Sequence, residues 1–200
     1  MMSRHHNERE AVAMNIRSTF ARHLSALVPR RAVRRFLRAQ SGAAAIEFGL
    51  VAVPFLALTF AIMETALVFF SGQTLEAAAA ASARLIMTGQ AQSAGYTAQQ
   101  FKQQVCNQIF GLFDCANGVS VDVKSYANFA SVSTTPPVTN GQLNTANMSY
   151  SPGGPGSIVV VTLYYQWPIY VSLLGDNLSN LNGNNHLLVA TNVFRNEPYQ

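Results

Sequence analysis

The longest apolar run of the chain lies between positions 43 and 70 and is interrupted only by Glu47 and Glu64. Between these two acids, residues 48–63 read FGLVAVPFLALTFAIM and carry no charge. A helix needs about 20 apolar residues, each rising about 1.5 Å, to cross a bilayer. The glutamates are 17 positions apart, about 25 Å of helix, and so fall near opposite edges of a hydrocarbon core about 30 Å thick. We therefore predict one transmembrane helix over residues 43–70.

The helical pattern continues beyond the apolar run. Residues 71–91 read SGQTLEAAAAASARLIMTGQA, in which the alanine block 77–81 favours a helix and permits close approach of a neighbouring helix. A continuous helix over residues 43–90 would be about 70 Å long, and we expect residues 71–95 to extend it as a stalk outside the bilayer. The alternative interpretation is a removable secretory signal. It is disfavoured because the apolar run exceeds the usual length of about 7–15 residues and no small-residue cleavage site follows it.

After the stalk, the spacing of apolar positions predicts a small mixed domain over residues 96–200. Phe101, Val105, Ile109 and Leu112 recur at helical spacing, which predicts an amphipathic helix over residues 97–113. Three segments rich in β-branched and aromatic residues predict strands, and two segments rich in Ser, Thr, Asn, Pro and Gly predict loops. The strands are expected at 119–126, 158–167 and 187–195, and the loops at 127–157 and 176–185. The expected fold class is α+β, with about three antiparallel strands beside a second helix, on a single transmembrane helix extended into a stalk.

Charge is distributed very unevenly and defines a basic leader over residues 1–42. The leader carries nine arginines and two glutamates, a net charge of +7, whereas residues 43–200 carry a net charge of −3. A basic tail can bind nucleic acid. The apolar run, however, follows the arginines directly, which favours a membrane explanation without nucleic acid. Arginines within about 15–20 positions of a spanning helix hold that flank in the cytoplasm, so residues 96–200 are expected outside.

The junction between leader and helix carries a short motif. Residues 38–50 read RAQSGAAAIEFGL: Gly42 ends the leader, Ala43 begins the helix, and Glu47 is the fifth residue after the glycine. This arrangement resembles the class III site at which a prepilin peptidase cuts type IV pilins and pseudopilins on the cytoplasmic side. The resemblance implies cleavage between Gly42 and Ala43, with Glu47 retained in the mature helix.

Glu47 is the acid of this motif, and its position inside the apolar run is physically unfavourable. A carboxylate at the hydrocarbon edge costs up to a few kcal/mol, so an intramembrane acid is expected to have a function and a partner. The expected partner is the new α-amino group, on its own or on a neighbouring subunit. The alternative is that Glu47 snorkels to the interface with no partner.

A longer part of the chain resembles the TadE-like family of tight-adherence pilus proteins. The resemblance covers about Arg35 to the C-terminus and is strongest in residues 38–90. Its signature is GAAAIEFGLVAVPFLALTFAIMETALVFF, residues 42–70, with Glu64 as a second acid late in the helix. Residues 159–169 and 191–199 are similar to segments of alphaproteobacterial members. The leader is long for the family, and Met14 is an alternative start.

The resemblance implies a minor pilin-like subunit in the assembly of a tight-adherence (Flp-type) pilus and in secretion. Its expected location is the bacterial inner membrane, with one membrane pass, a cytoplasmic N-terminus and a periplasmic C-terminal domain. The expected partners are the prepilin peptidase, other pilin or pseudopilin subunits, the Tad assembly machinery and membrane lipid.

Cys106 and Cys115 are the only cysteines of the chain, and both would lie outside. In an oxidising periplasm such a pair is expected to form a disulfide. Two free thiols and a metal pair are the alternatives. Two thiolates do not complete a tetrahedral zinc site, so no metal is expected.

No catalytic cluster is recognisable in the exported domain. His186 lies in an asparagine-rich turn, and Asp114, Asp122 and Asp176 have no spacing that pairs them. Nucleophile-elbow, phosphate-loop and HExxH motifs are missing from the sequence. We therefore expect neither an enzyme nor a cofactor, and regard a membrane-tethered enzyme as the weakest hypothesis. The main alternative is an uncleaved single-pass anchor that carries a periplasmic binding module, and processing of the leader distinguishes the two.

Overall fold

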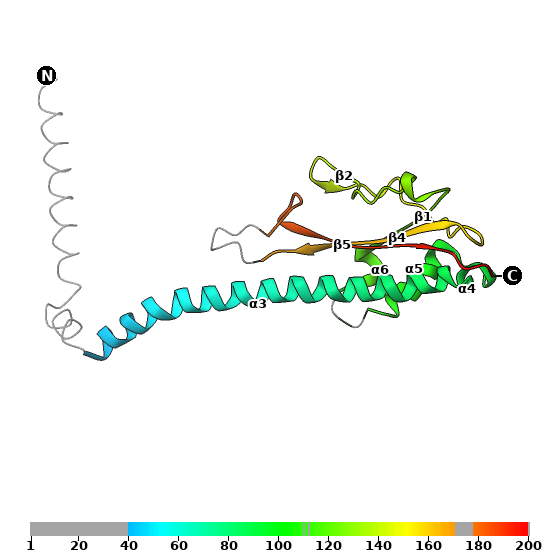
Figure 1. The fold of residues 1–200 in the computed structure, drawn as a ribbon. Coiled ribbons are helices and arrows are strands. Elements are labelled where there is room, and N and C mark those ends of the chain that lie inside the picture. The colour runs from blue at the N-terminus through cyan, green and yellow to red at the C-terminus, as the bar shows by residue number, and fades with distance from the viewer. Residues whose placement is uncertain (1–39, 110, 112, 171–177, 200) are drawn as a thin grey trace, which may run out of the picture. The chain divides into compact units, whose positions relative to one another are not determined.

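The computed structural model describes residues 40–109, 111, 113–170 and 178–199. The chain divides into two compact units, Met1–Leu56 and Ala57–Gln200, which are described separately. Helix α3 (Gln40–Met87) has 48 residues and contributes to both units (Figure 1). The basic leader, the loop segment 171–177 and Asp176 lie outside the described residues.

The part of α3 that belongs to the first unit exposes its large apolar side chains. Phe48 is 75% exposed and Leu50 is 72% exposed. A helix that is apolar on every side and uncovered by protein is typical of a membrane span. Among the described residues, α3 is the one helix that is long and apolar enough to cross a membrane, judged by length and composition. Pro54 lies inside this helix, as membrane helices tolerate.

The second unit is built on a three-stranded antiparallel sheet with the order β1-β4-β5. In the central strand, Leu163 is opposite Val121 on one side and Ala190 on the other. The central strand is buried from Ile158 to Tyr164, because both faces of the sheet are covered there. The strands are β1 (Val119–Tyr126), β4 (Ile158–Pro168) and β5 (Asn185–Arg195). The predicted α+β class is confirmed, as are the three predicted strands.

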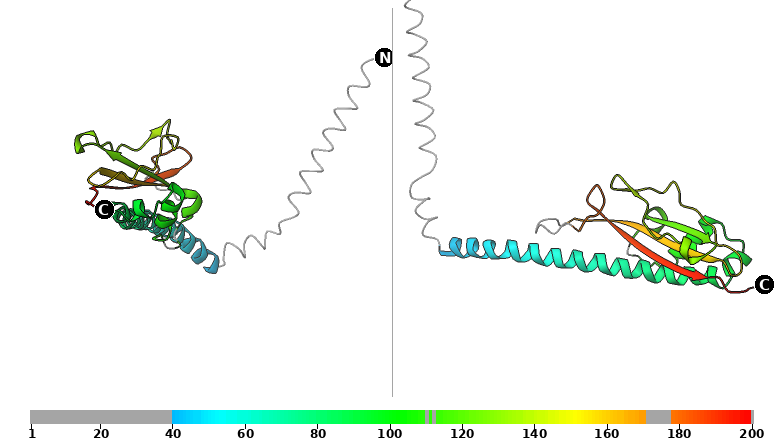
Figure 2. Two further views of the ribbon diagram at one scale, coloured as in Figure 1. Left: turned by 90° about the vertical axis from the view of Figure 1, so that its right-hand side faces the viewer. Right: turned by 45° about the horizontal axis from the view of Figure 1, so that its top comes forward.

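Helices cover one face of this sheet (Figures 1 and 2). Leu75, Ala78 and Ile86 of α3 are fully buried in one core with Phe101 and Val161. The C-terminal half of α3 therefore contributes to the core of the head and is covered along one side. The other helices are α4 (Gln90–Ser93), α5 (Ala98–Cys106) and α6 (Cys115–Gly118).

Residues 127–157 cover the opposite face of the sheet. This segment was predicted to be a loop, but it contains a short helix and a small hairpin whose turn, Asn140-Gly141, has positive φ at both residues. Leu143 and Met148 pack against Tyr164 and Leu187 in a second, smaller core. Strands of two residues are too short for an alternating pattern to reveal. The elements are η1 (Phe129–Ser131), β2 (Val138–Thr139) and β3 (Gln142–Leu143).

Helix α3 ends against the C-terminal tail of the chain. Gly89 follows the helix at φ 77°, a left-handed conformation that favours glycine. A Cβ atom at Gly89 would lie 2.3 Å from Cγ of Tyr199, so the close approach also requires glycine. The backbone N–H of Glu197 donates to the carbonyl oxygen of Met87 at 2.9 Å. The tail thereby satisfies one of the carbonyl groups left free at the end of the helix.

Helix α5 is shorter than predicted. It begins with a capping box in which Thr97 and Gln100 each accept a hydrogen bond from the backbone of the other. It ends at Cys106, so the prediction of a helix to residue 113 is wrong. The chain turns back through Gly111, which has φ 61°, and a disulfide joins Cys106 to Cys115 with a Cα–Cα distance of 5.5 Å.

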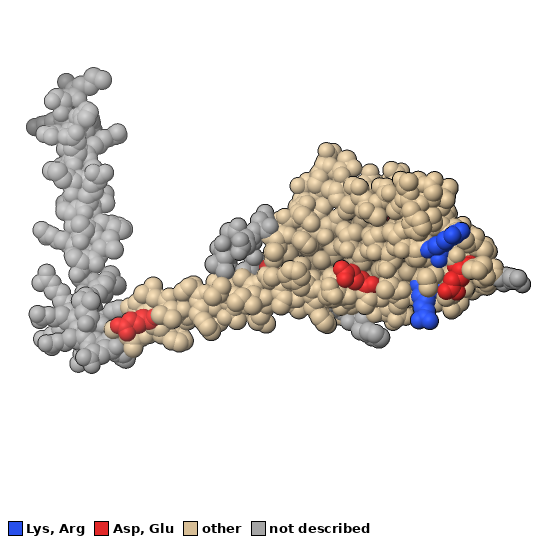
Figure 3. Space-filling model, viewed as in Figure 1, with Lys and Arg blue, Asp and Glu red and all other residues tan. Residues whose placement is uncertain are grey.

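Packing and hydrogen bonds, more than ion pairs, hold the head together. Figure 3 shows few charged side chains on the face viewed there. Within the described part of the chain, the salt bridge is that of Lys124 with Asp122, at 2.7 Å. The hydrogen bond that the Lys124 ammonium donates to Asp122 raises the pKa of Lys124, so this lysine is charged at neutral pH.

We expect the double variant Cys106→Ser/Cys115→Ser to lower the free energy of unfolding by about 2–3 kcal/mol, because the cross-link restricts the unfolded chain over a short loop. Denaturant unfolding of the purified full chain in detergent measures this, and non-reducing mass spectrometry of the wild type should yield the linked peptides. Complete alkylation of both thiols in the native protein would contradict the pairing.

Candidate functional site

The motif residues of the leader junction lie on the first turns of α3, which begins at Gln40. Gly42 is partly exposed, whereas Ala43 and Glu47 are exposed. A Cβ atom added at Gly42 would have no neighbouring atom within 4 Å among the atoms described. The fold of the described residues therefore does not require glycine at position 42.

Glu64 lies where the head begins to cover the helix. Glu64 is only 8% exposed, and its Oε1 accepts a hydrogen bond of 2.5 Å from the backbone N–H of Tyr170. Val68, Ser71 and Leu75, the next buried positions of α3, follow at helical spacing on the same face. Glu64 is therefore the first residue of the helix face that packs under the head.

The partner of Glu64 is held in place by the end of the sheet. Tyr170 follows β4 through Pro168 and Ile169, and Ile169 is 4% exposed. The N–H of Ile169 donates to the carbonyl oxygen of Asn184 at 2.9 Å, which continues the pairing of β4 with the turn before β5. A backbone N–H fixed in this way stabilises a carboxylate by a charge-assisted hydrogen bond. The side chain of Tyr170 remains 80% exposed.

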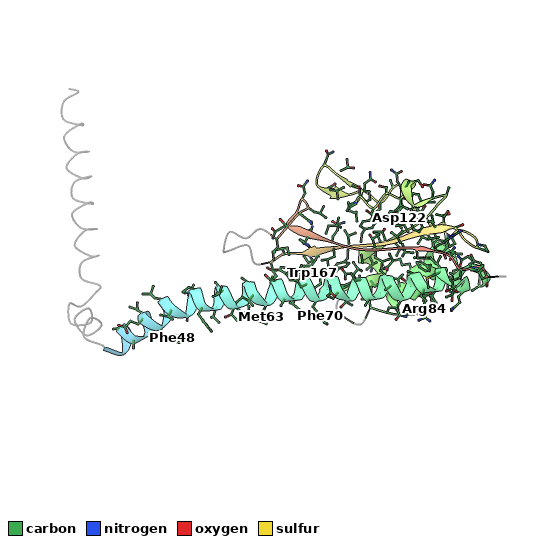
Figure 4. The ribbon with its side chains drawn as sticks, in the orientation of Figure 1. Phe48, Met63, Phe70, Arg84, Asp122 and Trp167 are labelled. Carbon is green, nitrogen blue, oxygen red and sulfur yellow. A yellow bond between two sulfur atoms is a disulfide. The ribbon has the colours of Figure 1, made fainter. Side chains whose placement is uncertain are left out.

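Figure 4 shows the environment of the helix on either side of Glu64. Met63 is 54% exposed and Phe70 is 60% exposed on the side of α3 away from the sheet, whereas Trp167 belongs to the sheet that packs on the helix. The helix thus presents apolar side chains outward while it buries one face against the head. Sequence reasoning identified Glu64 as an acid near the membrane edge but not its contact with Tyr170, because 106 positions separate the two residues.

Residues 42–84 match the model of a family described as TadE-like protein. The resemblance to the TadE-like family is confirmed. No curated protein and no solved structure matches the chain. The TadE-like match begins at the junction glycine and includes Glu47, Glu64 and most of the buried face of α3. Together with the one long apolar helix, it indicates a single-pass, pilin-like protein associated with the Tad pilus.

The acids and the histidine of the described head have structural contacts. Asp114 caps α6 by accepting hydrogen bonds from Asn117, which lower the pKa of its carboxyl group. Asp122 accepts from the backbone N–H of Ser149 at 2.9 Å, and His186 contacts the carbonyl oxygen of Leu178. No group of three or more metal-ligating side chains occurs within the residues that the structure describes. TadE-like proteins are a pilus-associated structural family.

We expect Glu64→Ala to destabilise the head by about 1–3 kcal/mol, because the part-buried hydrogen bond between Glu64 and the N–H of Tyr170 is lost. Glu64→Gln retains an acceptor oxygen and should preserve most of the stability. The measurement is denaturant unfolding of the full chain in detergent, followed by protease sensitivity of the head.

The matched control for Glu64 is Glu76→Ala, which removes an exposed acid from the same helix. Its effect should stay within about 0.5 kcal/mol, as for most surface substitutions. Equal destabilisation by Glu64→Ala and Glu64→Gln would show that the hydrogen bond to Tyr170 does not hold the head on the helix.

Proposed function

We propose that this protein is a minor pilin-like subunit that acts in assembly of a tight-adherence (Flp-type) pilus and in secretion, after a prepilin peptidase cuts between Gly42 and Ala43. The observation that carries the proposal is the junction motif at the start of α3, where the TadE-like match also begins. The other partners are further pilin or pseudopilin subunits, the Tad assembly machinery and membrane lipid.

The environment of Gly42 supports the cleavage site. Since no atom crowds this position, a glycine there serves access to the backbone and not packing within the fold. A residue without a side chain allows close approach of another backbone or of an enzyme. The bond to Ala43 lies within the first turn of α3, and helix ends fray readily.

The position of Glu47 supports a role after cleavage. Cutting before Ala43 creates an α-amino group four positions from Glu47, on the same face of the helix. A carboxylate and an amine at this spacing attract one another, and the attraction is stronger in a medium of low dielectric constant. The exposed Glu47 of one subunit is equally accessible to the new N-terminus of a neighbouring subunit.

The orientation follows from the distribution of charge. The arginine-rich leader is retained in the cytoplasm by the positive-inside rule, and the head is exported to the periplasm of the inner membrane. The disulfide of Cys106 with Cys115 agrees with this compartment, because disulfides persist in oxidising environments.

We expect Gly42→Val to retain the leader, because a branched side chain obstructs the peptidase at the scissile bond without disturbing the uncrowded helix. N-terminal sequencing of the wild-type protein from a strain with an active prepilin peptidase should read Ala-Ala-Ala-Ile-Glu. The matched control is Gly49→Val, since Gly49 lies in the same helix and is equally uncrowded, and this variant should be cut normally. Recovery of the intact leader on the wild type would favour the uncleaved membrane-anchored binding module.

Glu47→Ala should be cleaved normally yet fail to assemble, because the new N-terminus then lacks its partner. Glu47→Asp should assemble partly, since the shorter side chain misplaces the charge. Leader processing by intact mass and pilus assembly by surface shearing and electron microscopy separate the two steps. Normal pili with Glu47→Ala would leave the carboxylate without the proposed role.

A further inference from the structure

The outer backbone edge of β5 has a defined set of outward-pointing groups. β5 lies at one edge of the sheet order β1-β4-β5. In an antiparallel pair, opposed residues alternate between hydrogen-bonded and non-hydrogen-bonded positions. The N–H of Ile169 donates to Asn184 O, and the N–H of Asn196 donates to Ser157 O, at the two ends of the same continuous register. The even-numbered residues of β5 therefore bond to β4, and the odd-numbered residues direct their N–H and C=O groups outward.

Both ends of this outer edge are closed by the protein itself. At the start of β5, the N–H of Leu187 donates to Oδ1 of Asn180 at 2.7 Å. Beyond its end, the N–H of Glu197 donates to Met87 O at 2.9 Å. Between these two points, four outward-facing residues have backbone groups that no described residue bonds. They are Val189, Thr191 and Val193, and Arg195 at the end of the strand.

Residues 189–193 themselves have no feature that discourages pairing, and the charged side chains nearby lie at their margin, Arg195 at the end of β5 and Arg84 and Glu197 in the groove beside it. Proteins commonly protect sheet edges with proline, charged side chains, bulges or a covering segment. Residues 189–193 read VATNV, without proline or charge, and the register of β5 with β4 has no bulge. The opposite edge of the sheet is bridged at Val123 of β1, whose N–H donates to Ser149 O and whose carbonyl oxygen accepts from the N–H of Ser151.

A groove runs beside the open edge, where α3 passes close to β5 (Figure 2, right). Its volume is about 350 Å³. The alanines of α3 leave room there for the side chains of an added strand, and Val193 is 40% exposed beside it. The groove is lined by Ala80, Ala83, Arg84 and Met87 of α3 and by Asn192 and Phe194 of β5.

We propose that the outer edge of β5 at Val189–Val193 accepts an extended segment of another exported subunit as a fourth strand of the sheet. An extended backbone offers donors and acceptors in the alternation that Val189, Thr191 and Val193 present. Apolar side chains of the added segment lie in the groove on α3. A helix or a small molecule does not satisfy three outward-facing residues of one strand in this way.

The directions of α3 and β5 exclude a symmetric pair of identical copies as the occupant, and this step rests on the proposed single-pass anchoring. A Cβ built on Gly72 lies 3.9 Å from Cδ2 of Leu188, and Met87 bonds Glu197, so α3 and β5 run in the same direction. Two β5 edges paired antiparallel are related by a two-fold axis perpendicular to the sheet. Their α3 helices would then point in opposite directions and would not enter one membrane. In a parallel pair related by a two-fold axis along the strands, each outward N–H group would face the same N–H group of the other copy, so the two edges could not form hydrogen bonds. Head-to-tail pairing of identical copies would need a second open edge of this sheet, and the edge of β1 is bridged at Val123. We therefore assign the occupant to a segment of a different chain.

The test uses the full-length protein in its native membrane, with a photo-crosslinking residue at Asn192, which lines the groove. We expect an adduct with another subunit of the pilus machinery. Thr191→Pro removes an outward N–H that has no partner in the described chain, and an edge strand tolerates proline at such a position. It should reduce the adduct about tenfold, as expected from the loss of about one hydrogen bond and from steric obstruction. Val193→Lys, which places a charge at the edge, should act in the same direction.

The matched control is Ala98→Pro, because Ala98 is the first residue of α5, where the N–H needs no helical partner and proline is favoured. It should leave the adduct unchanged, and protease resistance verifies that each variant folds. An adduct between two copies of this chain overturns the choice of a different subunit. Two outcomes would overturn the proposal for the edge alone. One is an adduct that neither edge variant reduces. The other is that no adduct forms in cells that process the leader and assemble pili. A normal, edge-dependent adduct on a protein that retains its leader supports the edge and overturns the proposed function.

Discussion

The head depends on the close contact between an alanine-rich face of α3 and the β4–β5 part of the sheet. Ala78 and Ala79 are fully buried, and Ala83 is 4% exposed. Their small side chains bring the helix close to the sheet, while Leu75 and Ile86 on the same face fill the space at either side. Since these helix residues belong to the same core as the sheet, the head is not a domain carried on an independent rod. Removing them would expose the apolar face of the sheet to water.

This arrangement makes Glu64 a boundary between two environments. Apolar side chains before it, such as Phe60 and Met63, are exposed, whereas the residues that follow on its face are covered by the head. A carboxylate is costly to bury unless hydrogen bonds compensate for lost hydration. The N–H of Tyr170 provides such compensation from the end of the sheet. The acid thus marks the depth at which the helix changes from a surface for lipid to a surface for protein, and the head begins where an apolar span of suitable length ends.

The features that the sequence predicted well are those with a local cause. The β-branched runs gave the three strands, with β1 at the predicted bounds, and the long apolar run with the alanine block after it gave α3. The pairing of Cys106 with Cys115 was expected from compartment and count, and the two residues do lie together. The early end of α5 depends on a turn at Gly111, and the cover of residues 127–157 depends on contacts with Tyr164 and Leu187. The bond between Glu64 and Tyr170 joins segments that no local pattern relates. Long-range contacts of this kind could therefore not be predicted from the sequence.

The extent of the TadE-like match has a structural meaning. Residues 42–84 comprise the junction motif, the apolar span and most of the helix face that the sheet covers, but none of the strands. One helix accordingly provides both the apolar span for the membrane and the packing face for the head, and it does so through separate sets of residues. The apolar side chains of the first half need only be long enough to span, whereas the small side chains of the second half must fit a sheet. A sheet needs only a complementary apolar face to satisfy that second requirement. The edges of the sheet take no part in this packing on α3. The edge of β5 can therefore serve the proposed contact with another chain.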